Sequence, residues 1–367
     1  MNDVLIDSST QYDATRFLFA KHAVIETRNY VFPTPDSLYF IKLGKISVAG
    51  ESHTITVLNA QLQHRGTRSE FEKKLPRRDQ MYDVVLPKVV LSGVNWRDLV
   101  NGEKIFSKQM QIYGGTVSVF SDLSIPLGEG QPMNHFPHQL VMMIPIPVLV
   151  SQLKFHQLKV IFQQYNPETK STGMVTVSHI NGIAEHITNI PAEIKRSPQT
   201  LLSASGLFMN KVQLAARFRF DLSKYRSGQF SVDVAMDSLN KNVVNPIAQP
   251  LGRFTVKNGQ MQHGTTHIEG DNFNLQGTIQ VDYSDLHLTP LKSDSGRGGL
   301  KKNHLKSFFA NTIFIKNANP QGGELREPTF TVGRDHHENF VAYIWTAILT
   351  GLCKTIGVPV KLVVKEN

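Results

Sequence analysis

The chain has 367 residues, 40% of them hydrophobic, and a formal net charge of +9 at pH 7. This length allows two or three compact domains or one large sheet-rich body, and the composition supplies enough apolar surface for a sizeable core. The charge favours an anionic partner such as a membrane surface, an acidic lipid or a nucleic acid, although a basic soluble surface has the same property. Because Cys353 is the only cysteine, an intrachain disulfide is excluded.

The first part of the chain predicts short strands separated by polar turns. Strands are expected at 23–27, 39–47 and 53–58. The basic segment at 65–78 is interpreted as a solvated loop or as a contact for lipid or phosphate. The first ten residues lack the basic and apolar regions of a signal peptide. Since they already resemble the middle of a strand, we expect the chain to be the C-terminal part of a longer protein, or its start to be misassigned.

Strands interrupted by turns are expected up to residue 150. An apolar run occupies 84–94, and a short helix is expected at 95–101. Residues 109–125 predict two strands joined by a tight bend at a pair of glycines. The apolar run at 139–150 contains two prolines, which exclude a long regular helix, and it is too short to span a bilayer.

From residue 152 onward the alternation becomes regular, which is typical of an antiparallel meander with one dry face. Further strands are expected at 153–155, 158–162, 174–180, 184–190, 212–222, 230–236 and 277–284, and near 254, 265, 273 and 310–316. A helical turn is expected within 237–250. A sheet of about 18 to 22 strands is too large to stay open and flat, so it must curl, close or split.

A long apolar helix is predicted at 340–358, because Phe340, Ile344, Ile348 and Leu352 recur every four residues beside Trp345. Thr346, Thr350 and Lys354 form a polar stripe. We therefore expect an amphipathic helix that plugs the end of the sheet, with a helix lying on a membrane or spanning it as alternatives.

Motifs of catalysis and metal binding are missing from the sequence, which contains no phosphate-binding loop, zinc-protease motif, nucleophile elbow or cysteine knuckle. His135 and His138 lie in a Pro-rich loop without a third metal ligand. Asp335 and Glu338 are interpreted as a capping box for the terminal helix. The glycine-rich segment 295–302 lacks the spacing of a phosphate cradle. Basic residues near it have few aromatic neighbours, which argues against nucleic acid. We expect no enzyme activity, no metal and no cofactor.

Several segments resemble the AsmA-like, TamB-related family of envelope proteins. The resemblance lies in Asn245-Pro246-Ile247-Ala248, Gly259 and Gly277-Thr278 to Leu286. Other segments are similar to the Bacteroidota branch of that family. These segments are Leu91 to Trp96, Val119 to Asp122, Ala310-Asn311, Asn317 to Pro320, Gly333 to Asp335 and the helix bearing Trp345. These motifs are diffuse but cover most of the chain.

The resemblance implies a non-enzymatic protein of the bacterial periplasm, attached to the inner membrane through an N-terminal segment missing from this chain. Such proteins are associated with carrying phospholipid between inner and outer membranes and with outer-membrane assembly. The implied partners are phospholipid or another lipid, a membrane surface and envelope assembly proteins. A structural or adhesive β-sandwich without lipid cargo is the alternative.

The expected fold is mainly β, with a long curved antiparallel sheet forming an open groove and a C-terminal amphipathic helix. We divide it into an N-terminal part (1–150), a central antiparallel part (151–290) and terminal strands with a capping helix (291–367). The residues expected to line the groove are Phe218, Phe220, Val232, Val234, Ile279, Val281 and Tyr283. Those expected to contact anionic headgroups are Lys292, Arg297, Lys301, Lys302 and Lys306.

Overall fold

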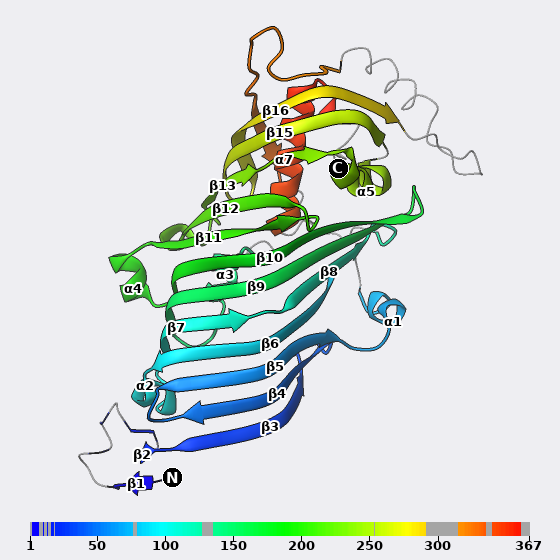
Figure 1. The fold of residues 1–367 in the computed structure, drawn as a ribbon. Coiled ribbons are helices and arrows are strands. Elements are labelled where there is room, and N and C mark those ends of the chain that lie inside the picture. The colour runs from blue at the N-terminus through cyan, green and yellow to red at the C-terminus, as the bar shows by residue number, and fades with distance from the viewer. Residues whose placement is uncertain are drawn as a thin grey trace.

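The computed structural model of the chain is mainly β, as predicted (Figure 1). It describes residues 2–6, 10, 13, 16, 17, 19–75, 79–126, 135–252, 254–290, 315–334 and 340–360. The strands form one sheet of 15 and a separate sheet of two.

Alternating apolar and polar residues form the strands, because this period places one side of a sheet in a dry environment. In chain order they are β1 (Asn2–Val4), β2 (Ala20–His22), β3 (Val24–Pro33), β4 (Tyr39–Ala49), β5 (Thr54–His64), β6 (Gln80–Val94), β7 (Ile105–Tyr113), β8 (Thr116–Asp122), β9 (Val148–Asn166), β10 (Ser171–Thr188), β11 (Gln199–Phe208), β12 (Val212–Asp221), β13 (Phe230–Met236), β14 (Leu239–Asn240), β15 (Phe254–Gly270), β16 (Asn274–Pro290) and β17 (Thr329–Gly333). The small sheet pairs β1 with β2.

The helices are short, except for the last one. They are α1 (Arg68–Glu72), α2 (Trp96–Val100), α3 (Pro137–Met142), α4 (Pro191–Arg196), α5 (Lys241–Ile247) and α7 (Phe340–Ile356), with a 3-10 turn η1 (Leu222–Lys224) and a π-helical turn η2 (Ala248–Gly252). Asn95 caps α2, and Thr67 and Glu70 form a capping box at the start of α1. The predicted helix at 95–101 is confirmed, whereas α1 interrupts what the sequence suggested was a plain basic loop.

Strands that follow one another along the chain are mostly neighbours in the large sheet, which runs from β3 at one edge to β17 at the other. Its pairings are antiparallel except in the middle, where β7 and β8 both run parallel to β9. A parallel pair needs a crossover, and here the connection between β8 and β9 contains α3. The alternating pattern does not encode strand direction, so it could not reveal this crossover. The boundary proposed at residue 150 falls inside β9, and the sheet continues through it.

A line of backbone irregularities crosses the sheet from β3 to β10. The register skips Asn29 opposite Gly44, Gly44 opposite Asn59, and Asn59 opposite Pro87. It continues through the junction of β7 and β8 at Gly114-Gly115 to Gln157 in β9 and His179 in β10. Asn29, Asn59, Gln157 and His179 all have φ between 50° and 60°. We call this line the crease.

The crease also shifts the phase of each strand's alternation. In β5 the apolar residues Ile55 and Val57 precede Asn59, and Ala60 and Leu62 follow it. Their partners in β4 are Val48, Ile46, Leu43 and Ile41 in that order. Because Asn59 has a positive φ and is skipped in the pairing, the inward-facing positions change from odd to even there, and both segments keep their apolar side chains on the same side of the sheet.

The largest core lies between α7 and the C-terminal strands. It contains Tyr343 and Ala347 of α7, Val232 of β13, Ile268 of β15 and Phe330 of β17, all fully or almost fully buried. We call the side of the sheet on which α7 packs the inner face and the other side the outer face. Among the described residues, no helix is both long enough and apolar enough to span a membrane.

Other details of the C-terminal region differ from the expectation. Ile315 and Lys316 are not in a strand, and the rest of the strand predicted at 310–316 lies largely outside the described residues. The neighbour of β16 is instead β17. The expected capping residues Asp335 and Glu338 also lie outside the described residues. Cys353 is buried in α7.

Candidate functional site

The inner face of β3–β9 is largely apolar, with Thr27 of β3 as a polar exception. The pairing of residues across neighbouring strands places the following residues on it, and each is partly exposed: Ile41, Leu43, Ile46, Val57, Ala60, Val84, Leu86, Met110, Ile112, Val117, Val119, Leu153, Phe155, Leu158, Val160 and Phe162. We call this area the uncovered section. Among the described residues, none of these side chains belongs to a cluster of buried residues.

Packing closes the uncovered section only near the strand ends. At one end Trp96 of α2 is fully buried with Phe17 and Val94, and it donates its indole N–H to the Gly50 carbonyl at 2.8 Å. At the other end Phe71 of α1 packs on Tyr39. In the middle of the strands Val89 is 6% exposed, but its neighbours Val57 and Ile112 are partly exposed, and no helix in the described part of the chain packs on them. On the edge strand β3, Tyr30 is 51% and Phe32 42% exposed.

The outer face of the same strands is mainly polar, although it includes apolar residues such as Val31, Leu58 and Val85. Gln109 donates to Gln152 at 2.9 Å across the parallel pair of β7 and β9, and Gln111 donates to Gln109 at 2.7 Å. Lys42 donates to Gln63 at 2.6 Å between β4 and β5. The two faces therefore differ in chemistry, and only the inner one would gain from an apolar guest.

The predicted groove residues lie on the inner face, but α7 covers them. Phe220, Val232, Ile279, Val281 and Tyr283 are at most 6% exposed. Phe218 and Val234 are partly buried against the same core. The alternation identified the dry side correctly, but these side chains are occupied by the helix. The apolar residues that remain accessible lie in the N-terminal half instead.

The phase shift at the crease is the signal that could have identified that half. Strands β3 to β6 each change their apolar parity at an Asn, Gly or Pro, as at Asn59 and Pro87. The alternation in these strands is therefore interrupted, and each uninterrupted part is short. The prediction of the groove residues rested instead on the longer unbroken alternation of β12, β13 and β16.

The predicted face of the terminal helix is the face that packs. Phe340 and Ile344 are buried, and Ile348 and Leu352 pack against the same core. Trp345 contacts a second cluster, which contains Phe208, Val212 and residues of α5. Gly351 permits the close approach, since a Cβ there would lie 2.6 Å from Ile279 Cγ2 and 2.9 Å from Phe330 Cδ1. Helix α7 is thus firmly seated on the sheet.

Tyr283 connects the sheet to the chain around α7. Its hydroxyl donates to the Lys316 carbonyl at 3.0 Å and accepts from Arg326 Nη2 at 3.2 Å. Burial raises the pKa of Tyr283 above its usual value, and Arg326 partly offsets this effect. The side chain is therefore part of a structural network, which the groove prediction did not anticipate.

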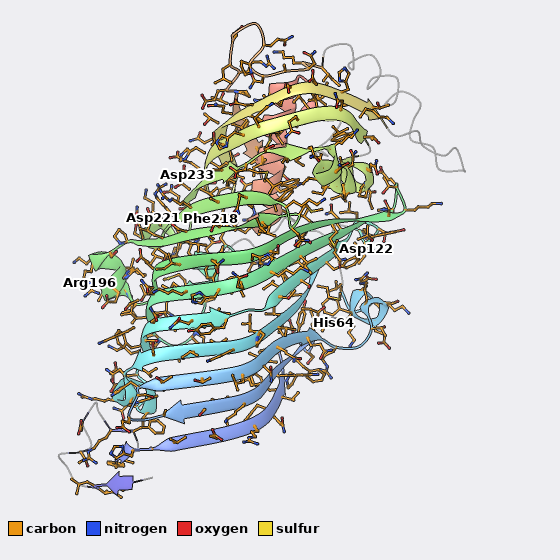
Figure 2. The ribbon with its side chains drawn as sticks, in the orientation of Figure 1. His64, Asp122, Arg196, Phe218, Asp221 and Asp233 are labelled. Carbon is orange, nitrogen blue, oxygen red and sulfur yellow. The ribbon has the colours of Figure 1, made fainter. Side chains whose placement is uncertain are left out.

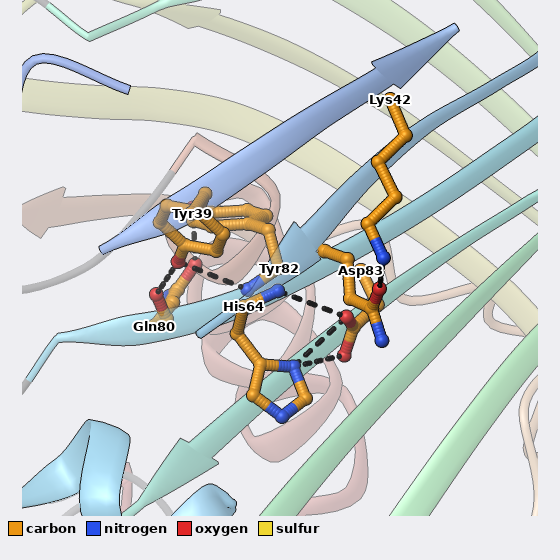
Figure 3. A network of polar contacts seen from close by, with 7 residues as sticks. Tyr39, Lys42, His64, Gln80, Tyr82 and Asp83 are labelled. Carbon is orange, nitrogen blue, oxygen red and sulfur yellow. Dashed lines mark hydrogen bonds and ion pairs between the residues drawn. The ribbon is translucent and has the colours of Figure 1, made fainter. Parts of the chain in front are cut away.

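A polar network joins β4, β5 and β6 at their ends (Figure 3). The Tyr39 hydroxyl donates to the Gln80 carbonyl at 3.3 Å and accepts from the Tyr82 amide at 3.2 Å. His64 Nδ1 lies 2.9 Å from Asp83 Oδ1. Burial raises the pKa of Tyr82 to about 12, so its phenol stays neutral. These contacts fix the strand ends beside α1.

The basic side chains proposed as headgroup contacts, Lys292, Arg297, Lys301, Lys302 and Lys306, lie outside the described residues. In the other basic segment, Arg68 stacks over the ring of Phe120 at 3.6 Å and Arg65 over Phe40 at 4.6 Å. Both guanidinium groups thus have aromatic partners at the end of the sheet.

His138 is buried, whereas His135 is exposed. The imidazole of His138 stacks on Phe220 at 5.1 Å, and neither ring nitrogen has a hydrogen-bond partner. Burial lowers the pKa of His138 to about 4, so the ring is neutral near pH 7. Among the described residues, no group of three or more His, Cys, Asp or Glu side chains is placed to hold a metal ion.

The outer face of the C-terminal strands carries charged pairs around a depression of about 430 Å³ lined by Arg219, Asp221 and Glu269. Figure 2 labels Asp221 of β12 and Asp233 of β13. Beside the depression, Asp233 lies 3.0 Å from Arg219 Nη1 and 2.6 Å from His267 Nδ1. The hydrogen bond from His267 is the main cause that lowers the pKa of Asp233. These exposed pairs are typical of a solvated sheet surface.

No protein-family model and no curated protein matches this chain. Its function is therefore inferred from the two faces of the sheet and from the family resemblance in its sequence.

Proposed function

We propose that this chain is a non-enzymatic lipid-binding protein whose inner face forms an open groove for the acyl chains of a phospholipid. The guest lies on the uncovered section, while its headgroup stays outside in water. The observation that carries the proposal is the continuous apolar surface of β3–β9, which the described part of the chain leaves without a protein cover. Proteins seldom leave a contiguous apolar surface of this extent exposed unless it binds something.

The free energy of acyl-chain burial supports this function. Each CH₂ group removed from water contributes roughly 0.8 kcal/mol, so a chain of sixteen carbons gains on the order of 12 kcal/mol. A surface of Val, Ile, Leu and Phe side chains offers this gain without directional bonds. Transfer along such a surface requires no catalytic group, because the acyl chain remains buried as it moves.

The length of the uncovered section suits one leaflet of lipid. From β3 to β9 the sheet spans six strand positions. At about 4.8 Å per step these cover roughly 25 Å. One leaflet occupies about half of a hydrocarbon core of about 30 Å, so an extended acyl chain fits lengthwise or across the strands.

The resemblance to AsmA-like proteins supports a setting in the bacterial envelope. There the protein would carry phospholipid between the inner and outer membranes or assist outer-membrane assembly. In this proposal α7 closes the groove at its C-terminal end, since it fills the inner face of β12–β17.

Two neighbouring valines of β6 provide a matched test. Val84 lies on the inner face opposite Leu62, and Val85 lies on the outer face opposite Gln61. We expect Val84→Asp to reduce the phospholipid that copurifies with the protein by tenfold or more, because a carboxylate would then contact the acyl chain. Val85→Asp should retain the lipid. Native mass spectrometry and extraction with organic solvent measure both.

A wild-type protein that carries no lipid and takes none up from vesicles would overturn the proposal and favour a structural or adhesive module. Equal lipid content in the Val84→Asp and Val85→Asp proteins would show that any bound lipid lies elsewhere. Circular dichroism and urea unfolding confirm that both variants remain folded.

A further inference from the structure

An exposed apolar segment spans the end of α3 and the loop that leads from it into β9. Four of its side chains face solvent, with exposed fractions of 48% for Leu140, 62% for Met143, 38% for Ile144 and 41% for Ile146. The sequence contains no charged residue from Gln139 to Leu153. We call residues 140–146 the apolar loop. Four large exposed apolar side chains within seven residues exceed what an ordinary surface loop carries.

The apolar loop lies at one end of the strands, together with other turns. Gln139 donates to the Tyr225 carbonyl at 2.8 Å and to Asn272 Oδ1 at 3.0 Å, and Asn272 donates to the Arg226 carbonyl at 2.8 Å. Phe273, 54% exposed, follows Asn272 directly. These buried amides hold the turns β12–β13 and β15–β16 beside the start of α3, on the side of the molecule where Figure 1 shows α3 and α4. The exposed side chains therefore stand on a fixed support.

The backbone of the apolar loop is largely satisfied internally. Asn189 donates to the carbonyls of Ile144 and Ile146 at 3.0 and 2.9 Å, and it accepts from the Val148 amide at 2.7 Å. The amides of Met143 and Ile144 bond to carbonyls of α3. The two prolines at 145 and 147 have no N–H to satisfy. A segment that enters a bilayer needs this property, since hydrocarbon offers no hydrogen bonds, whereas a solvated loop does not.

Charged residues flank the apolar loop without entering it. The same end of the sheet carries Lys195, Arg196, Lys224 and Arg226 and the carboxylates Glu193, Asp221 and Asp271. Arg196 pairs with Glu193, and Lys224 lies 3.9 Å from Asp221. No ion pair among the described residues joins Lys195 or Arg226 to a carboxylate. This small cationic excess suits a surface that contains anionic lipid, and apolar contact provides most of the affinity.

We propose that the apolar loop inserts into the surface of a lipid bilayer and docks this end of the sheet on a membrane. Docking would place the inner face, which α3 adjoins, next to the lipids that enter or leave it. The inference deepens the proposed function by naming where the protein contacts its source or destination membrane. The biological purpose of this docking rests on the proposed function, but the experiment that tests the docking does not.

Two methionines offer a matched pair of variants. Met143 is in the apolar loop, and Met174 is 43% exposed near the start of β10, at the opposite end of the strands. We expect Met143→Asp to weaken binding to vesicles of phosphatidylcholine and phosphatidylglycerol by about tenfold or more, because a carboxylate would have to enter the bilayer interface. Met174→Asp should bind as the wild type does. Flotation with vesicles measures both.

Wild-type protein that does not float with vesicles, or Met143→Asp protein that floats unchanged, would overturn the proposal. So would an equal loss in both variants, since that would reflect net charge alone. If sedimentation velocity instead shows a dimer that Met143→Asp dissolves, the loop joins two copies and the membrane assignment is wrong. Val84→Asp should still float, and Met143→Asp should still contain bound lipid, so failure of one proposal is distinguishable from failure of the other.

Discussion

His138 is the most unusual single residue in the described part of the chain. It is 3% exposed, stacks on Phe220 and lies near Phe136, yet neither of its nitrogens forms a hydrogen bond. A buried imidazole in this setting behaves as an aromatic spacer that must stay neutral. It joins the crossover to β12, and among the described residues it belongs to no group of three or more His, Cys, Asp or Glu side chains placed to hold a metal ion.

This environment predicts acid sensitivity. The folded protein takes up a proton on His138 at about pH 4 and the unfolded chain at about pH 6.5. Between these values the unfolded state binds more protons, so the free energy of unfolding falls as the pH is lowered, by up to about 3 kcal/mol. His138→Phe keeps a stacked ring and should reduce this loss, with little change at neutral pH. Urea unfolding across this pH range checks it, and an unchanged pH dependence in the variant would contradict the assignment.

Helix α7 divides the inner face into a filled part and an uncovered part. Its four-residue apolar repeat packs on β15, β16 and β17, and Gly351 sits against Ile279 and Phe330. Isolated helices of this length are marginal in water, so α7 depends on this packing for its stability. The expected groove residues are its packing surface.

Cys353 gives a direct measure of whether α7 is docked. The thiol is 3% exposed, and burial raises its pKa to about 12, so it should react slowly with thiol reagents. Gly351→Val would force side chains into Ile279 and Phe330 and should weaken docking by about 1–3 kcal/mol. We expect labelling to become tenfold faster or more. Gly333→Val is the control, because nothing lies within 4 Å of a Cβ there. Equal rates in both variants would mean that α7 is not held by this contact.

The whole sheet combines two regions with different cores. The strands β12–β17 share a buried core with α7, whereas β4–β8 are anchored mainly at their ends by the clusters around Trp96 and Phe71. Local stability follows buried apolar contact, so the two regions should not open with the same free energy. A groove that accepts a guest fits the less stable region.

Hydrogen exchange can test this difference. In lipid-free protein we expect amides in the middle of β4, β5 and β6 to exchange at least tenfold faster than those of β13, β15 and β16. Added phospholipid should slow exchange in the first group, because a guest supplies the missing cover. Mass spectrometry of peptides from both groups measures it. Uniform protection along the sheet would show that the N-terminal strands need no guest.

Much of this architecture follows from local pattern alone. Alternation in segments such as Val212–Asp221 and Phe230–Met236 predicted strands with one dry side, and the apolar repeat from Phe340 predicted a helix. Both periods are properties of neighbouring residues, so a single sequence reveals them. The parallel pairing of β9 was not predictable in this way, since the same alternation serves parallel and antiparallel neighbours.

The sequence by itself therefore determined that the protein is a large sheet with an apolar side, a polar side and a terminal helix. Only the tertiary structure decided which stretch of the apolar side the helix occupies and which remains accessible. Val232 and Val84 have the same side chain and both point to the inner face of the sheet, yet α7 buries the first and leaves the second partly exposed. The difference comes from a contact more than one hundred residues away along the chain, and no local period contains that information.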